Sequence, residues 1–246
     1  MKRAFLFSTA LLAACAAPLP QQPPAGMPAQ VPAPEVRAGD TWTYRVRDAY
    51  TGLPRGEQSY RVAEVAAQRV KVIAELEGAA REEQLYDRHW NWLRRPATNL
   101  QSFEYSPAYP AFDFPLAAGK RWSAQVIATD PADGRRFPVS IHAQVLGWER
   151  VKVPAGEFDA LKVKRQVFFD YWVLGVRGRS EIVEYDWYAP AVKQVVRREA
   201  SSMYLSYLYG GAGRAGLLLV SKEDDGGPRF VRDDWLVAEL VSYTVR

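Results

Sequence analysis

The sequence reads Thr41-Trp42-Thr43-Tyr44-Arg45-Val46-Arg47, a stretch in which polar and apolar side chains alternate. Because successive side chains of a β-strand point to opposite faces, this pattern predicts a strand with one buried and one solvated face. The same alternation returns in three further stretches, Ser59–Val62, Arg69–Ile73 and Leu161–Val167. Strands of this kind are typical of antiparallel sheets.

Turn-forming residues separate these stretches, at Thr51-Gly52, Asp133-Gly134, Pro154-Ala155-Gly156 and Asp225-Gly226-Gly227. The chain also contains 8 Trp, 13 Tyr and 10 Phe, residue types that favour pleated surfaces. Beyond the first 14 residues, no window keeps a helical apolar stripe for three turns. We therefore predict an all-β fold. Residues 36–246 form one antiparallel domain of about a dozen strands, as a curled sheet, half-barrel or sandwich.

A short motif, Ala-Gly-x-x-Trp-Thr/Ser-x-x-Val, occurs twice in this domain, at Ala38–Val46 and at Ala118–Val126. Duplication of one β module explains the match. Chance explains it too, because glycine is common before an aromatic strand. We predict that Trp42 and Trp122 are buried anchors of equivalent strands and not platforms for a ligand.

The first residues have the features of an export signal. Lys2 and Arg3 precede a largely apolar segment, Ala4–Ala14, which is too short to span a bilayer. The sequence Leu12-Ala13-Ala14-Cys15 matches the lipobox of bacterial lipoproteins, in which small residues admit the peptidase and the thiol forms a thioether to diacylglycerol. We predict a signal peptide over residues 1–14 and lipidation of Cys15.

Cys15 is the only cysteine, so an internal disulfide is impossible, and a lone thiol in an exported protein needs another role. An ordinary signal cut nearby is the alternative. Residues 15–35 then comprise the lipidated cysteine and a Pro- and Ala-rich linker, read as an extended stalk. Ala16 resembles the position that permits sorting to the outer membrane in two-membrane bacteria. The expected location is therefore the cell envelope, lipid-anchored on the outer membrane and facing the periplasm.

Three longer motifs carry a resemblance: Gly39-Asp40-Thr41-Trp42-Thr43-Tyr44, Val153-Pro154-Ala155-Gly156-Glu157-Phe158-Asp159-Ala160 and Trp187-Tyr188-Ala189-Pro190. The chain resembles an uncharacterised family of exported, β-rich bacterial lipoproteins of unknown function. That resemblance implies a fold and an envelope location, and no activity. The residues alone explain the second motif as a structural hairpin, with a turn at Pro154–Gly156 and Asp159 bonded to nearby backbone N–H groups.

Charge and motifs exclude several classes of partner. Of the 32 basic residues two lie in the signal, and the remainder nearly balance 28 acidic residues. No stretch gathers positive charge on one face as phosphate binding requires, so we expect no nucleic acid. Gly211–Gly216 spells G-x-G-x-x-G, but the apolar run after it is too short for the helix of a dinucleotide site. We expect a hairpin loop there, with contact to lipid as the alternative, and no cofactor.

No metal site is expected either. His89 and His142 share no ligand spacing. His89 lies in a cluster that either stacks arginine on indole or forms an exposed hairpin, with Arg88, Trp90, Trp92, Arg94 and Arg95. The acidic pairs are read as solvated loop charge, and the last two could alternatively hold Ca²⁺: Glu82-Glu83, Asp224-Asp225 and Asp233-Asp234.

No catalytic residue is assigned, because no serine lies in G-x-S-x-G or S-x-x-K and the only cysteine is used by the anchor. An acid/base pair assembled by the fold stays open. The sequence favours first a structural or interaction module of the envelope, second a carrier of an apolar ligand or lipid, and last a hydrolytic enzyme. An apolar cavity would favour the carrier, and a solid core the module. Any ligand is expected to be apolar and held by side chains rather than by a metal or nucleotide.

Overall fold

The computed structural model describes residues 22–96, 102–173, 176–206 and 229–246. The signal peptide, the lipobox with Cys15, the Gly211–Gly216 motif and the Asp224-Asp225 pair lie outside these ranges. Of the residues described, none belongs to a helix long and apolar enough to cross a membrane.

Twelve strands and one short 3₁₀ turn make up the regular structure of these ranges. They are β1 (Thr41–Asp48), β2 (Pro54–Val65), β3 (Val70–Leu76), β4 (Glu82–Tyr86), β5 (Trp92–Pro96), β6 (Ser102–Tyr109), β7 (Arg121–Thr129), β8 (Arg136–Val153), β9 (Gly156–Val173), β10 (Val176–Ala189), η1 (Pro190–Val192), β11 (Gln194–Ser206) and β12 (Arg229–Thr244).

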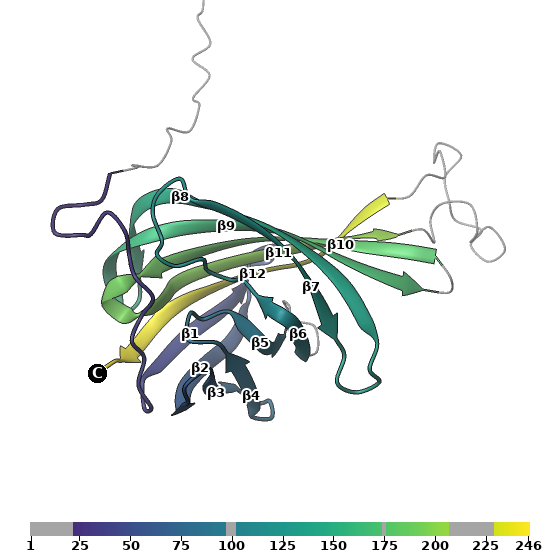
Figure 1. Ribbon diagram of the computed structural model, residues 1–246, viewed down its shortest axis with the longest axis horizontal. Helices are drawn as coiled ribbons and strands as arrows, with labels where there is room; N and C mark the ends of the chain where they lie inside the picture. The colour runs from purple at the N-terminus through teal and green to yellow at the C-terminus, as the bar shows by residue number, and fades with distance from the viewer. Residues whose placement is uncertain (1–21, 97–101, 174–175, 207–228) are drawn as a thin grey trace, which may run out of the picture.

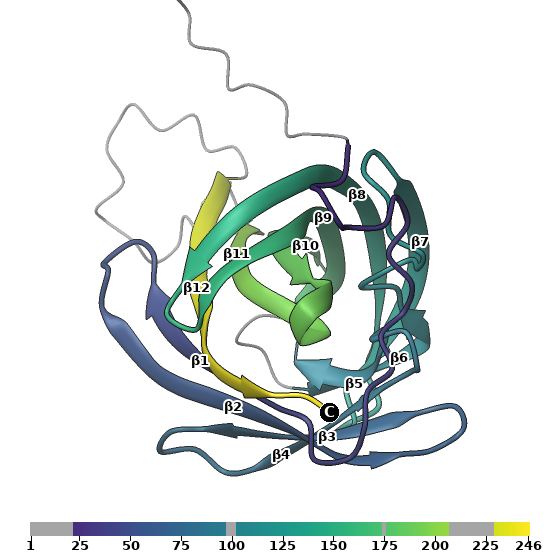
Figure 2. The ribbon, with the colours of Figure 1, turned by 90° about the vertical axis from the view of Figure 1, so that its left-hand side faces the viewer.

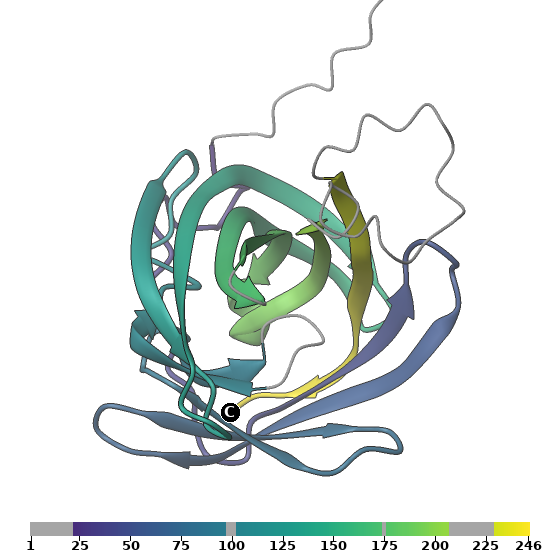
Figure 3. The same cartoon turned by 90° about the vertical axis from the view of Figure 1, so that its right-hand side faces the viewer.

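Each strand pairs antiparallel with its neighbour in the chain, and β12 returns to pair with β1, so the sheet closes into a barrel. The long strands β8 to β12 form one side and the shorter strands β1 to β5 the other (Figure 1). Figures 2 and 3 view the molecule from either end and show the strands arranged in a ring. The predicted all-β antiparallel domain of about a dozen strands is confirmed, and its arrangement is a closed barrel.

The duplicated motif has the same backbone geometry in both copies. Gly39 and Gly119 have positive φ angles of 92° and 81°, which glycine adopts without strain. The Gly39 N–H donates to Val62 O at 2.8 Å, and the Gly119 N–H donates to Val145 O at 2.9 Å. Each of these valines directly precedes a register shift, in β2 and β8 respectively. The barrel thus consists of two six-stranded halves that begin with the same turn, which favours duplication.

The two tryptophans of the motif differ in burial. Trp42 is 1% exposed, as expected of a buried anchor. Trp122 is only partly buried and packs against the edge of the core, with its Nε1 donating to Pro110 O at 2.9 Å. The expectation of a buried Trp122 is therefore wrong, because its hydrogen bond holds the indole towards the loop before β7.

The hairpin between β8 and β9 packs against the last strand, β12. Pro154 and Ala155 form the turn, and the Ala155 N–H donates to Leu240 O of β12 at 2.9 Å. Phe158 meets the ring of Tyr243 at a centroid distance of 6.0 Å. The structural role expected of this motif holds, but Asp159 accepts from the Arg150 side chain across the strand pair rather than from backbone N–H groups.

The chain before β1 also packs on the barrel. Val31, 2% exposed, forms a two-hydrogen-bond bridge with Leu116, inside the segment read from sequence as the end of the stalk. Asp40 is fully buried and accepts from the backbone N–H of Arg37 at 2.9 Å and of Arg246 at 3.0 Å. One carboxylate thus ties the start of β1 to the C-terminal residue.

Candidate functional site

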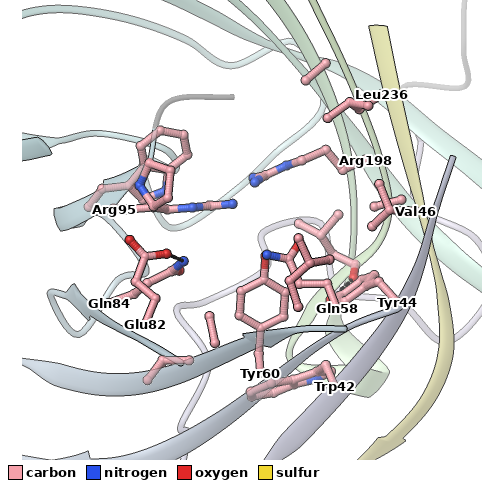
Figure 4. Close-up of a pocket in the computed structure, with 18 of the residues that line it drawn as sticks. Trp42, Tyr44, Val46, Gln58, Tyr60, Glu82, Gln84, Arg95, Arg198 and Leu236 are labelled. Carbon is pink, nitrogen blue, oxygen red and sulfur yellow. Dashed lines mark hydrogen bonds between the residues drawn. The ribbon is translucent and has the colours of Figure 1, made fainter. Parts of the chain in front are cut away.

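The barrel encloses a cavity of about 580 Å³ between strands β1 to β5 and strands β10 to β12. Figure 4 shows side chains from both walls converging on it. Most of the lining is aromatic or aliphatic: Trp42, Tyr44, Val46, Tyr60, Val72, Ala74, Leu76, Ala79, Ala80, Tyr86, Trp90, Trp92, Pro96, Phe112, Val195, Ala200, Leu236 and Ala238.

Strand alternation places these residues inside. In β1 the buried positions are Trp42, Tyr44, Val46 and Asp48, and the residues between them are half-buried or exposed. The first three line the cavity. These are the apolar positions that the period of two assigns to the core face. Small side chains at Ala74, Ala200 and Ala238 leave the space that larger residues would fill, so the barrel is hollow there.

Three buried aromatics close one end of the cavity. Trp90 meets Trp42 and Tyr86 edge-to-face, at centroid distances of 5.8 and 5.1 Å. Trp42 Nε1 donates to Val192 O at 2.8 Å, and Trp90 Nε1 donates to Lys193 O at 3.2 Å. The Trp187-Tyr188-Ala189-Pro190 motif ends β10 and leads into η1, and the carbonyls of Val192 and of Lys193 after it fix both indoles.

A network of four charged side chains forms one wall of the cavity, in which Glu184 and Arg198 line the cavity and Arg165 and Asp186 are fully buried. Arg165 is fully buried and donates from Nε to Glu184 at 2.8 Å and from Nη2 to Asp186 at 2.6 Å. Arg198 donates from Nε and Nη2 to the two oxygens of Asp186 at 2.6 and 2.8 Å. Tyr109 Oη completes the network by donating to Glu184 at 3.2 Å. Two positive and two negative charges are thus matched out of water.

The ion pairs of this network keep Asp186, Arg165 and Arg198 ionised. Burial by itself raises the pKa of Asp186, but the Arg165 and Arg198 guanidiniums outweigh it and hold that pKa below its usual value. Burial likewise disfavours charged Arg165, whereas Asp186 and Glu184 raise its pKa overall. Burial also raises the pKa of Tyr86 in the cavity wall to about 12. At neutral pH the cavity therefore presents neutral phenols beside a fixed ionic wall.

Polar groups also line the cavity on β4. Tyr86 Oη donates to Gln84 Oε1 at 2.7 Å, and Gln84 Nε2 donates to Glu82 Oε2 at 3.1 Å. Ser102 Oγ donates to the other oxygen of Glu82. Because positions 82, 84 and 86 share the inner face of β4, this chain of contacts runs along the wall (Figure 4).

Arg95 of β5 enters the cavity from the opposite side to Arg198, and Figure 4 shows the two guanidiniums pointing toward one another. The Arg95 guanidinium carbon lies 4.4 Å from the centroid of Trp92, whose other stacking partner is Tyr109 at 4.1 Å. Of the two interpretations of this cluster, arginine stacked on indole is the one the structure shows.

The sequence-predicted polar residues are scattered by the fold. His89 is exposed in the turn between β4 and β5, and His142 is exposed on β8, where Ser123 contacts its Nδ1 at 3.0 Å. Within the described ranges, no group of three or more His, Cys, Asp or Glu residues could hold a metal ion.

Two acidic pairs read as solvated loop charge lie on strands instead. Glu82 lines the cavity while Glu83 pairs with Lys71 at 3.3 Å. Asp234 also lines the cavity, and Asp233 accepts from Ser202 at 3.2 Å. The loop interpretation is wrong for both pairs, because Glu82-Glu83 belongs to β4 and Asp233-Asp234 to β12. Adjacent residues of a strand face opposite sides of the sheet, so one residue of each pair lines the cavity.

The sequence reasoning missed the buried ionic network. Its signal was present in Leu161–Val167, where Arg165 falls on the same phase as Leu161, Val163 and Val167. A charge on the apolar phase of an alternating strand indicates a buried ion that needs a partner. No sequence pattern identified Glu184 and Asp186 as those partners.

No family model and no curated protein matches the chain. Among solved structures it is similar to a putative lipoprotein from Parabacteroides distasonis, with 18% identity, 87% of this chain and 99% of that chain covered, and a TM-score of 0.51. An exported protein with a YmcC-like fold from Bacteroides fragilis gives 16% identity, the same coverages of 87% and 99%, and a TM-score of 0.47. The hypothetical lipoprotein YmcC from Escherichia coli gives 13% identity, coverages of 82% and 84%, and a TM-score of 0.41. The first of these likenesses shows a shared fold.

Proposed function

We propose that this chain is a lipid-anchored protein of the cell envelope whose barrel binds one small, largely apolar molecule in its interior. The observation that carries the proposal is the cavity of about 580 Å³, which lies within the range of about 300–1,000 Å³ typical of small-molecule sites. Its lining fits the same description, mostly apolar with a few placed polar groups. This reverses the order expected from sequence, where an interaction module came before a carrier.

The anchor rests on the lipobox at Leu12–Cys15, and the similarity to the putative lipoprotein from Parabacteroides distasonis supports it. Outer-membrane sorting and the periplasmic orientation rest on Ala16. A binding role is favoured over hydrolysis because the cavity carboxylates Glu82 and Glu184 are already engaged by hydrogen-bond donors. We therefore propose no enzymatic activity.

Native mass spectrometry and lipid extraction test the proposal. The full chain is purified without detergent as the Cys15→Ser variant, which lacks the thiol that would accept a lipid anchor. We expect a small amphipathic molecule to accompany it, or saturable binding of 11-(dansylamino)undecanoic acid with a Kd near about 1 μM, that is about −8 kcal/mol.

A variant that fills the cavity supplies the control. Ala74→Trp places an indole inside the barrel, whereas Ser123→Trp places one on the exposed outer face of β7. Ala74→Trp should abolish probe binding while the protein melts no lower than Ser123→Trp. Equal binding by both variants, or no binding by the parent, would overturn the carrier proposal and return the interaction module to first place.

A further inference from the structure

Three guanidinium groups gather around one indole at the cavity. Those of Arg95, Arg198 and Arg165 lie 4.4, 5.8 and 5.9 Å from the ring centroid of Trp92. Glu184 and Asp186 neutralise Arg165 and Arg198. Arg95 forms no ion pair or hydrogen bond with any residue of the described ranges, so its guanidinium is not paired with a carboxylate there, although Glu82 and Asp234 also line the cavity.

The donors of this corner are available to a ligand. Arg198 uses Nε and Nη2 on Asp186, which leaves Nη1 for a further acceptor. Arg95 faces it across the cavity (Figure 4). Both guanidiniums lower the pKa of Tyr86 against the effect of burial, whereas Glu82 raises it, so the two arginines and Glu82 all act on this side chain of the cavity wall.

The acidic side chain on this wall is already engaged. Glu82 accepts hydrogen bonds from Ser102 and Gln84 and forms no ion pair with Arg95. Arg55, another basic residue at the cavity, pairs with Asp48 at 2.7 Å and is largely exposed. Among the arginines that line the cavity, Arg95 is therefore the one without an ion pair to a residue of the described ranges, and Arg198 faces it.

We propose that the ligand is an anionic amphiphile, whose single carboxylate or phosphate head lies between Arg95 and Arg198 and whose apolar chain extends toward Trp42 and Tyr60. This inference rests on the proposed function and names its ligand class. Charge-assisted hydrogen bonds from two guanidiniums in a partly desolvated site are the strong kind, and Arg forks match carboxylate and phosphate geometry. The apolar chain of such a ligand would contact the aromatic and aliphatic lining, and its charged head would contact the two guanidiniums.

Displacement of bound 11-(dansylamino)undecanoic acid by C12 compounds with different heads separates the two proposals. The competitors are laurate, dodecyl phosphate, 1-dodecanol and dodecyltrimethylammonium, each below its micelle concentration or solubility limit. We expect laurate or dodecyl phosphate to bind at least about tenfold more tightly than dodecanol, a difference of about 1.4 kcal/mol, and the cation not to compete. The better of the two anions identifies the head group.

Arg95→Gln should remove this preference, reducing laurate affinity at least about tenfold with little effect on dodecanol. Arg94→Gln is the matched control, because Arg94 lies on the same strand but reaches Glu104 and does not line the cavity. Glu82→Gln should strengthen laurate binding, since it removes a like charge.

Equal affinity for laurate and dodecanol, unchanged by Arg95→Gln, would overturn the anionic head while leaving the carrier intact. Failure of all four competitors and of the probe would overturn the carrier itself. A folded Arg95→Gln protein, shown by a melting temperature close to that of Arg94→Gln, makes either outcome interpretable.

Discussion

Asp186 is the residue on which the buried network depends most. It accepts hydrogen bonds from both Arg165 and Arg198, and its side chain is fully buried. Asp186→Asn leaves Arg165 and Arg198 with one buried negative charge too few. We therefore expect the free energy of unfolding, measured by urea denaturation, to fall by about 3–5 kcal/mol. Asp159→Asn is the control, because its partner Arg150 is largely exposed and such pairs contribute about 0–1 kcal/mol. Similar losses in both variants would contradict a special role for Asp186.

The inward tyrosines give a pH dependence that can be predicted. Burial raises the pKa of Tyr86 from 10.0 to about 12, and it also raises the pKa of Tyr44 well above its usual value. Between pH 10 and 12 the folded barrel therefore binds more protons than the unfolded chain, and the free energy of unfolding falls as pH rises through that window. Absorbance at about 295 nm should show one group of tyrosines titrating near the usual pKa of about 10 and a second group ionising only near pH 12 or with unfolding. A single titration with all tyrosines near pH 10 would be incompatible with this burial.

For individual residues, the sequence predicted which side chains of a strand face the core better than it predicted which residues of other strands they contact. Alternation assigned Trp42, Tyr44 and Val46 to one face, which is correct. It said nothing about which strand lies opposite, so neither the pairing of Arg165 with Asp186 nor the approach of Arg95 to Arg198 could be read from it. Those contacts depend on how the sheet curls, which is set by all strands together.

The two halves of the barrel begin with β1 and β7, and we expect the tryptophans of these two strands to contribute unequally to stability. Trp42 is 1% exposed and fixes one end of the cavity, while Trp122 is only partly buried. Truncating a buried tryptophan to alanine typically costs about 3–5 kcal/mol. Trp42→Ala should therefore lose about that much, and Trp122→Ala distinctly less, in the same denaturation experiment. Equal losses would mean that burial does not distinguish the two copies.

The hairpins were the elements best predicted from sequence, because their turn residues carry the signal locally. Pro154-Ala155 turns as expected, and Thr51-Gly52 does so with Asp48 accepting from the Thr51 N–H at 3.0 Å. The packing of the β8–β9 hairpin over β12 was not predicted, since a contact between Ala155 and Leu240 leaves no local trace in either segment.

For the whole molecule, the anchor is the prediction with the clearest test. Cys15→Ala removes the only thiol to which diacylglycerol could be attached. We expect the variant to lose metabolic labelling with a fatty acid and either to stay uncleaved or to leave the membrane fraction. A variant that is still labelled and fractionates like the parent would exclude Cys15 as the lipidation site.

The alternation of polar and apolar residues predicted the strands but not whether the sheet closes on itself. Half-barrel, sandwich and curled sheet share the same strands, and they differ in what the first and last strands do. Thr41 of β1 pairs with Thr244 of β12, which settles the architecture as a barrel.

That seam also decides when folding can finish. Every other strand pair joins neighbours in the chain and has a low contact order, whereas β1 must wait for residues at the opposite end of the sequence. Until β12 has paired with β1, the sheet has two unpaired edges, and unpaired edges are templates for aggregation. The folding chain is therefore exposed to misassembly until this last strand pair has formed.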